Sequence, residues 1–82
     1  MYSVEFSKVA EKQFYKLGKN LQSRIVATLE RCKIRPHAHI KKLVGNPYFS
    51  LRVGDYRVIL DIKDDKLIIF VIEVGHRKMV YG

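Results

Sequence analysis

The N-terminal part of the chain changes from a two-residue to a four-residue apolar period. Apolar and polar side chains alternate from Tyr2 to Phe6, which is typical of a strand with one buried face. Ser7 is a suitable N-cap for a helix that we expect to run to about Leu17, and Gly18 is suited to end it. The buried stripe of this helix is predicted to contain Val9, Ala10, Phe14 and Leu17.

A second helix is predicted after a short turn. Asn20 is a suitable N-cap, and the helix must end before Pro36 because a following proline disfavours helical backbone. Two helices joined by about three residues form an antiparallel hairpin. The next stretch, HAHIKKLVGNP, has no period and is expected to be irregular. The buried face of this helix is predicted to contain Leu21, Ile25, Thr28, Leu29 and Cys32.

From Tyr48 onward the sequence predicts a meander of three strands, YFSLRV, YRVILDIK and KLIIFVIEV. Gly54-Asp55 and Asp64-Asp65 separate them as two-residue loops. The first loop places Arg52 directly opposite Arg57, on the face of the sheet that turns away from the helices. The helix-facing side chains are then predicted to be Phe49, Leu51, Val53, Val58, Leu60 and Ile62.

The second loop decides which residues share the face away from the helices. With a two-residue loop, Ile72 lies next to Arg57 and Phe70 lies next to Ile59. These apolar side chains would form an exposed patch beside an arginine. Patches of this kind usually mark a surface where a partner binds.

The order of these elements predicts the fold class. The last strand is apolar on both faces and should therefore be central in the sheet. The connection through two helices requires the first strand to run parallel to a later strand. We expect an α+β fold of order β-α-α-β-β-β, with the helical hairpin on one face of a small mixed, mostly antiparallel four-stranded sheet. The 82 residues fit a single domain, residues 1–82.

Composition excludes several classes of protein. Hydrophobic residues make up 48% of the chain and charged residues 29%, so neither disorder nor a membrane span is indicated. Glu5 stands where a signal peptide would be apolar, and we expect a cytoplasmic protein. Cys32 is the only cysteine, which excludes an internal disulfide and favours a small buried residue. His37 and His39 have no further metal-ligand pattern around them, so no metal and no cofactor are expected.

The positive charge of the chain is unevenly placed. Sixteen lysines and arginines against eight carboxylates give a net charge of +8. Residues 1–54 hold eleven of the basic residues and three glutamates, whereas residues 55–82 hold five of each sign. This surplus favours a polyanionic partner, which leaves nucleic acid, an anionic membrane surface and an acidic protein open.

Two groups of basic side chains have both a structural and a functional interpretation. Arg52 and Arg57 repel each other across the sheet, so they either bend into solvent or pair with a nearby aspartate, or they clamp a phosphate. The exposed row on the first helix either is simply solvated or contacts a phosphate backbone without reading its sequence. This row consists of Lys8, Lys12 and Lys16.

The C-terminal stretch VGHRKMVYG carries a third group. Gly75 allows the chain to turn at the end of the last strand, so that His76, Arg77 and Lys78 emerge from a rigid support. Tyr81 adds an aromatic ring on which a base of single-stranded RNA could stack.

The segments SLRVGDYRVILDI and FVIEVGHRKMVY together resemble the RelE/ParE toxin superfamily, and specifically its RelE branch. The resemblance extends over nearly the whole chain. It implies a small α+β toxin that cuts messenger RNA on the ribosome as a metal-independent endoribonuclease. It also implies a RelB-like antitoxin that neutralises the toxin.

The resemblance extends to individual positions. It implies site roles for Arg57, for Arg77 and for the aromatic residue Tyr81, and Arg52 also matches a basic position of the family. The chain departs from the family at two strand positions, because Tyr48 and Ser50 replace two lysines of bacterial relatives. Lys41 and Lys42 lie upstream in the sequence without being aligned equivalents.

The chemistry implied by the resemblance suits these side chains. Attack of a ribose 2′-hydroxyl on the adjacent phosphate builds negative charge, which fixed arginines stabilise. His76 or Tyr81 would transfer protons. Two alternatives remain open: a ParE-like toxin that binds gyrase, against which Arg57, Arg77 and Tyr81 speak, and a catalytically weak RNA-binding member of the same fold, which the missing lysines favour.

Overall fold

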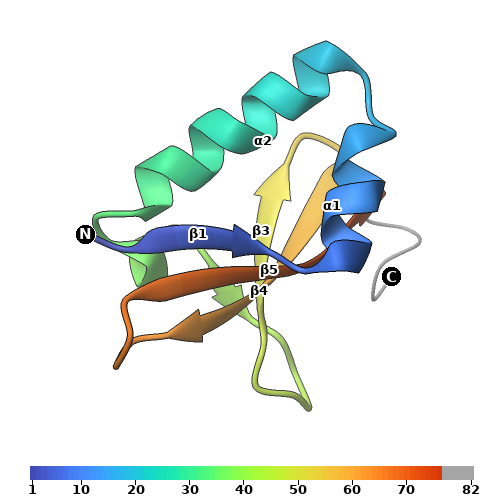
Figure 1. The fold of residues 1–82 in the computed structure, drawn as a ribbon. Helices are drawn as coiled ribbons and strands as arrows, with labels where there is room; N and C mark the ends of the chain where they lie inside the picture. Colours follow the sequence, from blue (N-terminus) through green and yellow to red (C-terminus); the bar gives the residue numbers. More distant parts are fainter. Residues whose placement is uncertain (77–82) are drawn as a thin grey trace.

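The computed structural model describes residues 1–76, in which two helices cover one face of a five-stranded sheet (Figure 1). The α+β fold with its helical hairpin and final meander is confirmed. The elements are β1 (Ser3–Phe6), α1 (Lys8–Tyr15), α2 (Lys19–Cys32), the 3₁₀ turn η1 (Pro36–Ala38), β2 (Lys41–Lys42), β3 (Phe49–Val53), β4 (Tyr56–Lys63) and β5 (Ile68–His76).

The sheet has the order β1-β5-β4-β3-β2. β1 runs parallel to β5 and the other neighbours are antiparallel, so the expected mixed sheet and the interior position of the last strand are confirmed. The expected number of four strands is wrong by one. Lys41 and Lys42 form the short edge strand β2, which pairs with Ser50 and Phe49. A two-residue strand is too short to show a period in the sequence.

The main core lies between the helices and the sheet. The prediction of Val9 in the buried stripe is wrong, because its side chain is 60% exposed while Ala10 and Phe14 are buried. Ala10 and Phe14 lie one turn apart on the face of α1 that enters the core, and Val9 lies one residue away from that line. The buried cluster consists of Ala10, Phe14, Ile25, Leu29, Cys32, Leu51, Val53, Val58, Leu60, Ile69, Val71 and Val74.

The N-caps of the two helices are Ser7 and Gly18. The Ser7 side chain accepts a hydrogen bond from the Ala10 N–H at 3.0 Å, which confirms Ser7 as the N-cap of α1. Gly18, not Asn20, is the N-cap of α2. The expectation that Gly18 ends the first helix is wrong, because α1 ends at Tyr15 with Lys16 as its C-cap.

The hairpin of β3 and β4 has the predicted register, with Arg52 opposite Arg57. Gly54 has φ +58° at the first position of its two-residue turn. A positive φ at the first turn position alone is the requirement of a type II′ turn, which glycine meets without strain.

The register of β4 and β5 differs from the prediction. Arg57 lies opposite Gly75, not next to Ile72, and Ile59 lies opposite Glu73, not next to Phe70. The loop contains four residues rather than two, because Lys63 pairs with Ile68. In addition, Ile72 is the extra residue of a β-bulge between the Ile59 and Leu60 pairs. A single extra residue moves every following side chain of β5 to the other face of the sheet.

Side chains of α1 hold this bulge in place. The Ser7 hydroxyl donates to the Ile72 carbonyl oxygen at 2.9 Å, and the Val74 N–H donates to Gln13 Oε1 at 2.7 Å. These two bonds give side-chain partners to backbone groups at the bulge and two residues after it. The N-cap of α1 therefore also sets the facing of the end of β5.

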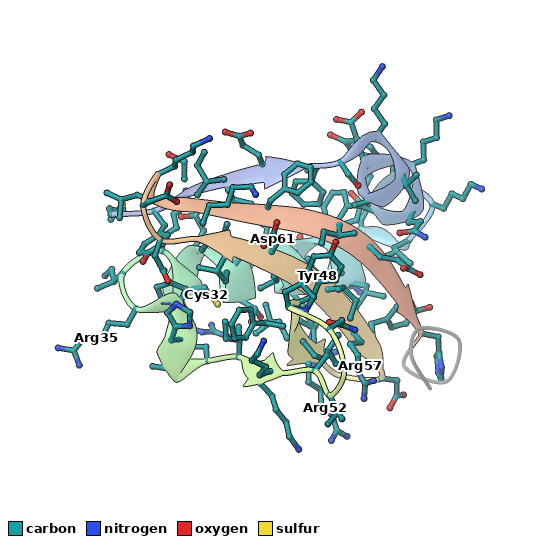
Figure 2. The ribbon with its side chains drawn as sticks, turned by 90° about the horizontal axis from the view of Figure 1, so that it is seen from below. Cys32, Arg35, Tyr48, Arg52, Arg57 and Asp61 are labelled. Atoms are coloured by element: carbon teal, nitrogen blue, oxygen red, sulfur yellow. The ribbon has the colours of Figure 1, made fainter. Side chains whose placement is uncertain are left out.

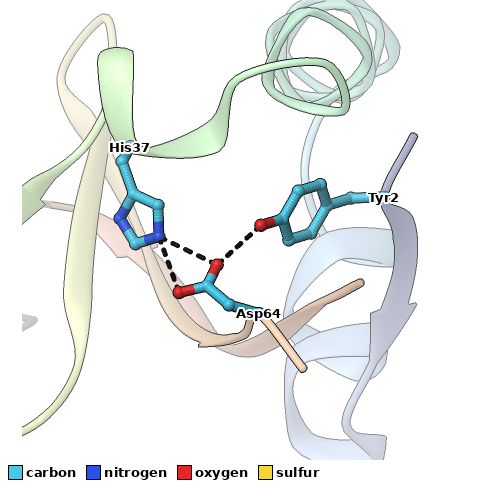
Figure 3. A network of polar contacts seen from close by, with 3 residues as sticks. All are labelled: Tyr2, His37 and Asp64. Carbon is cyan, nitrogen blue, oxygen red and sulfur yellow. Dashed lines mark hydrogen bonds and ion pairs between the residues drawn. The ribbon is translucent and has the colours of Figure 1, made fainter. Parts of the chain in front are cut away.

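The opposite end of the β4 and β5 pair carries a polar cluster of three side chains (Figure 3). Tyr2 donates its hydroxyl hydrogen to Asp64 Oδ1 at 2.6 Å, and His37 Nε2 lies 3.0 and 3.1 Å from the two Asp64 oxygens. The Tyr2 bond, and secondarily the His37 contact, hold the pKa of Asp64 below its ordinary value. The cluster ties β1 and η1 to the β4–β5 loop.

Three further features concern Cys32, membrane-spanning helices and clusters of metal-ligating side chains. Cys32 is fully buried, as predicted, and this burial raises the pKa of its thiol. In the described part of the chain, residues 1–76, no helix is long and apolar enough to cross a membrane. No three metal-ligating side chains of that same part come together.

Candidate nucleic-acid interface

Arg52 and Arg57 form the centre of the site on the face of the sheet away from the helices (Figure 2). They lie directly opposite each other, and their neighbours Leu51 and Val58 point into the core. Arg57 is half-buried, whereas Arg52 is exposed. The partner of Arg57 on β5 is Gly75, which adds no side chain beside the guanidinium. Two arginine forks at one place suit a phosphate group.

Lys41 joins these arginines on the same face. It pairs with Ser50 across β2 and β3, and Ser50 lies two residues before Arg52 on the same side of the strand. Lys42 points to the opposite side, where its Nζ lies 5.5 Å from the centre of the Phe49 ring and 3.3 Å from the Asn46 carbonyl oxygen. Only the first lysine of the pair therefore adds charge beside Ser50.

The apolar part of this face differs from the sequence prediction. Ile59 is fully buried and does not belong to an exposed patch with Phe70 and Ile72, which are half-buried. Figure 2 shows Tyr48 in front of the sheet, between Asp61 and Arg57 on β4. Tyr48 thus stands over the centre of this face.

His76 is placed at the end of β5 beside β4. Its ring lies 5.5 Å from that of Tyr56, at an interplanar angle of 71°. Because of the bulge, His76 follows Val74 and Tyr56 precedes Val58 on the helix side of the sheet, the side opposite Arg57. The structure brings His76 to the same end of the sheet as Arg57 but not to the same face. Arg77 and Tyr81 lie outside the described residues.

The remaining basic residues lie in a different layer. Lys8 and Lys12 are exposed on α1, and Lys16 is its exposed C-cap residue. Because α1 packs on β5 from the helix side, this row is separated from Arg57 by the sheet. The arginine face also includes two carboxylates, Glu73 opposite Ile59 and Asp61, whose Oδ2 lies 3.1 Å from Lys63 Nζ.

Comparisons with known proteins agree with this architecture. Residues 4–81 match the family model of the ParE toxin of the type II toxin–antitoxin system parDE. A protein of Escherichia coli named as a RelE-like toxin is 35% identical over 80 residues, which are 94% of this chain and 84% of that protein. The mRNA interferase toxin RelE of Escherichia coli K12 is 31% identical over an alignment with the same coverage.

This chain belongs to the RelE/ParE superfamily, on its RelE branch. It is a RelE-like toxin of a type II toxin–antitoxin system. Solved structures share the fold of the toxin. It is similar to the Mycobacterium tuberculosis RelBE2 toxin–antitoxin complex, with a TM-score of 0.84, 26% identity and coverage of 93% of this chain and 98% of that one. For the intact Escherichia coli RelBE complex these values are 0.80, 31%, 93% and 96%.

The toxin also shows a relation that the sequence did not indicate. Ser50 replaces a lysine that the resemblance implies, and Lys41 stands directly opposite it on the neighbouring strand. No signal in the sequence predicts this pairing, because it depends on the two-residue strand β2 and the loop that follows it. The structure therefore places Lys41 next to Ser50, on the neighbouring strand.

Proposed function

We propose that this toxin is an mRNA interferase that cleaves messenger RNA on the ribosome without a metal ion. The main support for this activity is that Arg52 and Arg57 lie directly opposite each other on one face of the sheet, with Lys41 on the same face. The similarity to an mRNA interferase toxin of Escherichia coli supports the same activity.

The chemistry that we propose is attack of a ribose 2′-oxygen on the adjacent phosphorus. The bond from phosphorus to the 5′-oxygen breaks, which yields a cyclic phosphate and a free 5′-hydroxyl. The proton of the 2′-hydroxyl passes to a base, and the leaving 5′-oxygen takes up a proton. Negative charge is greatest on the non-bridging oxygens of the pentacoordinate phosphorane, where Arg57 and Arg77 would stabilise it without reorganisation.

Lys41 and the end of β5 would supply the remaining groups. Lys41 adds positive charge beside Ser50, which restores part of the charge that the two family lysines provide. We assign proton transfer to His76 or Tyr81. His76 lies at the same end of the sheet as Arg57, although on the opposite face. The ribosome would hold the messenger in line for attack, which lowers the demand on these side chains.

A RelB-like antitoxin is the second proposed partner. The similar structures from Mycobacterium tuberculosis and Escherichia coli are toxin–antitoxin complexes. An acidic amphipathic segment would match the half-buried Phe70 and Ile72 and the arginines of the same sheet. Hydrogen exchange of the free and bound toxin tests this contact, which protection confined to α1 and α2 would contradict.

Single-turnover cleavage on programmed ribosomes tests the proposed activity. The purified toxin is added to ribosomes with a messenger codon in the decoding site, and the same messenger without ribosomes is the control. We expect cleavage within the decoding site on ribosomes and at least tenfold slower cleavage of the free messenger. An intact messenger after prolonged incubation would contradict the proposal.

Because the matching family model is named for the ParE toxin, action on gyrase is the second function to test. A toxin of that kind would act on gyrase, so a supercoiling assay with the same preparation is the matched measurement. Inhibition of supercoiling without messenger cleavage would favour that function. A protein that binds ribosomes but neither cleaves messenger RNA nor inhibits supercoiling would be a catalytically weak RNA-binding protein. The replacement of two family lysines by Tyr48 and Ser50 favours this alternative.

A further inference from the structure

A second cationic site lies on the helix side of the β3–β4 turn. A surface pocket of about 350 Å³ opens between α2 and this turn. Three of its seven lining residues are arginines, Arg24 and Arg31 from α2 and Arg52 from β3. The other four are Ala27, Thr28, Val53 and Gly54. No carboxylate of residues 1–76 lines the pocket.

None of the three arginines forms an ion pair with a carboxylate of residues 1–76. The ion pairs within residues 1–76 are Lys33 with Glu30, His37 with Asp64, and Lys63 with Asp61. None of these pairs includes an arginine of the pocket. Like charges at one pocket repel one another, and a bound anion would remove this repulsion.

Local contacts hold these side chains at the pocket. The Thr28 hydroxyl accepts from the Arg31 guanidinium at 3.3 Å and donates to the Arg24 carbonyl oxygen at 2.7 Å. Arg52 Nε donates to the Gly54 carbonyl oxygen at 3.3 Å, which bends Arg52 around the turn. A Cβ at Gly54 would lie 3.2 Å from both terminal nitrogens of Arg24, so the glycine leaves room for this guanidinium.

We propose that this pocket binds a phosphate group of an RNA backbone, separate from the phosphate at Arg57. The inference rests on the proposed function in its choice of RNA as the source of the phosphate. Arginine forks from two elements suit the oxygens of one phosphate, and contacts to phosphate need no particular base sequence. Arg52 is opposite Arg57 and also lines the pocket, so a strand bound at Arg57 can continue to it.

Inorganic phosphate provides the first test. Phosphate is titrated into the full chain at constant ionic strength, balanced with chloride, while the arginine Nε–Hε signals are followed by NMR. We expect Arg24, Arg31 and Arg52 to shift with one common saturation curve. Signals of Arg35, which is exposed and does not line the pocket, should move little. Equal small shifts of all arginines would overturn the proposal.

RNA binding by matched variants provides the second test. Arg24→Gln and Arg31→Gln each remove one charge from the pocket, and Arg35→Gln removes one charge elsewhere. We expect the pocket variants to weaken binding of a short single-stranded RNA about tenfold and to lower the salt slope by roughly 0.7 each. Arg35→Gln should weaken it less than about twofold. Equal losses in all three variants would mean that only net charge matters and would overturn the proposal.

A variant that keeps the net charge separates positioning from charge. Thr28→Val removes the hydroxyl that accepts from Arg31 and leaves every charge in place. We expect it to reduce phosphate and RNA affinity about threefold. Unchanged affinity would show that Thr28 does not hold Arg31 for binding, and would overturn this part of the proposal.

Three further measurements identify the source of the phosphate and separate this proposal from the proposed activity. Binding to ribosomes without messenger reports contact with ribosomal RNA, and binding to free single-stranded RNA reports contact with the messenger. A selective loss for Arg24→Gln in either measurement supports the pocket. Arg35→Gln, which changes a residue outside the pocket, should leave the cleavage rate of the parent unchanged. A parent toxin that binds phosphate here yet never cleaves messenger RNA would contradict the proposed function alone.

Discussion

The two ends of the β4 and β5 pair handle charge in opposite ways. At the loop end, Asp64 receives hydrogen bonds from Tyr2 and His37, and the cluster joins three segments of the chain. At the open end, Arg52 and Arg57 face each other directly, and Arg52 also meets Arg24 and Arg31 at one pocket. The loop end therefore surrounds a carboxylate with hydrogen-bond donors, whereas the open end places arginines close to one another.

This difference separates a structural role from a binding role. Arginines that lie opposite each other repel, and an anion bound beside them weakens this repulsion. A carboxylate with its own donors needs no ligand. The bulge at Ile72 lies between the two ends and turns Gly75, rather than a bulky side chain, toward Arg57.

The largest effect is expected from the arginines of the open end. Arg57→Ala removes a group that stabilises charge mainly in the transition state, so the cleavage rate on programmed ribosomes should fall by roughly 10² to 10³. Arg77→Ala should act similarly. Ribosome binding should change little, because it is spread over many cations. A folded Arg57→Ala toxin that binds ribosomes and cuts at the parent's rate would show that Arg57 is not a catalytic residue.

The two neighbouring lysines of β2 sharpen the comparison further. Lys41→Ala removes the cation beside Ser50 and should slow cleavage by about 10- to 100-fold. Lys42→Ala is the matched control, because that side chain lies over Phe49 on the other side of the strand. Single-turnover rates measure both. Equal rates for the two variants would show that the facing of Lys41 does not matter.

The third prediction concerns the bulge that separates the two ends. Gln13→Leu leaves the Val74 N–H without its acceptor and should lower the free energy of unfolding by about 1 to 3 kcal/mol. Ser7→Ala removes the N-cap and the bond to Ile72, with a cost of about 1 to 2 kcal/mol. Urea unfolding measures both changes. Gln22→Leu, which removes a bond to the Leu17 carbonyl oxygen away from the bulge, is the control.

In Gln13→Leu the end of β5 should also lose its fixed facing. Proton signals of His76 and Tyr56 would then shift relative to the parent, because their edge-to-face contact depends on the bulge. In Gln22→Leu these signals should stay. A bulge that persists unchanged in both variants would show that the strand register alone maintains it.

The smallest effect is expected at the loop end and depends on pH. Because the pKa of Asp64 is lowered by Tyr2 and then His37, the stabilisation is present above the ordinary carboxyl pKa and is lost as the pH falls through the lowered value. Tyr2→Phe should therefore be slightly less stable than the parent at pH 7, and the difference should shrink below about pH 4. Tyr15→Phe, on the exposed surface of α1, is the control. A difference that grows in acid would contradict this sign.

Much of the candidate site could be predicted from local pattern. Gly54-Asp55 indicated a two-residue turn, and from it followed the Arg52 and Arg57 pairing, which the structure confirms. Val9 is exposed, contrary to the prediction, because a short helix offers several possible stripes and only packing on the sheet selects one. The four-residue loop after Lys63 has positive φ at Leu67, a residue that gives no sign of a turn, and so it was missed.

The sequence by itself determined the order of the elements, the interior position of β5 and the surplus of cations, because apolar period and charge are properties of neighbouring residues. Only the tertiary structure decided which of these cations meet. Lys41 stands beside Ser50 through a two-residue strand, and Arg24 and Arg31 meet Arg52 across α2 and a turn. The bulge, held by Ser7 and Gln13, decides which face the end of β5 presents. Such contacts join residues far apart in the chain, and no local period contains them.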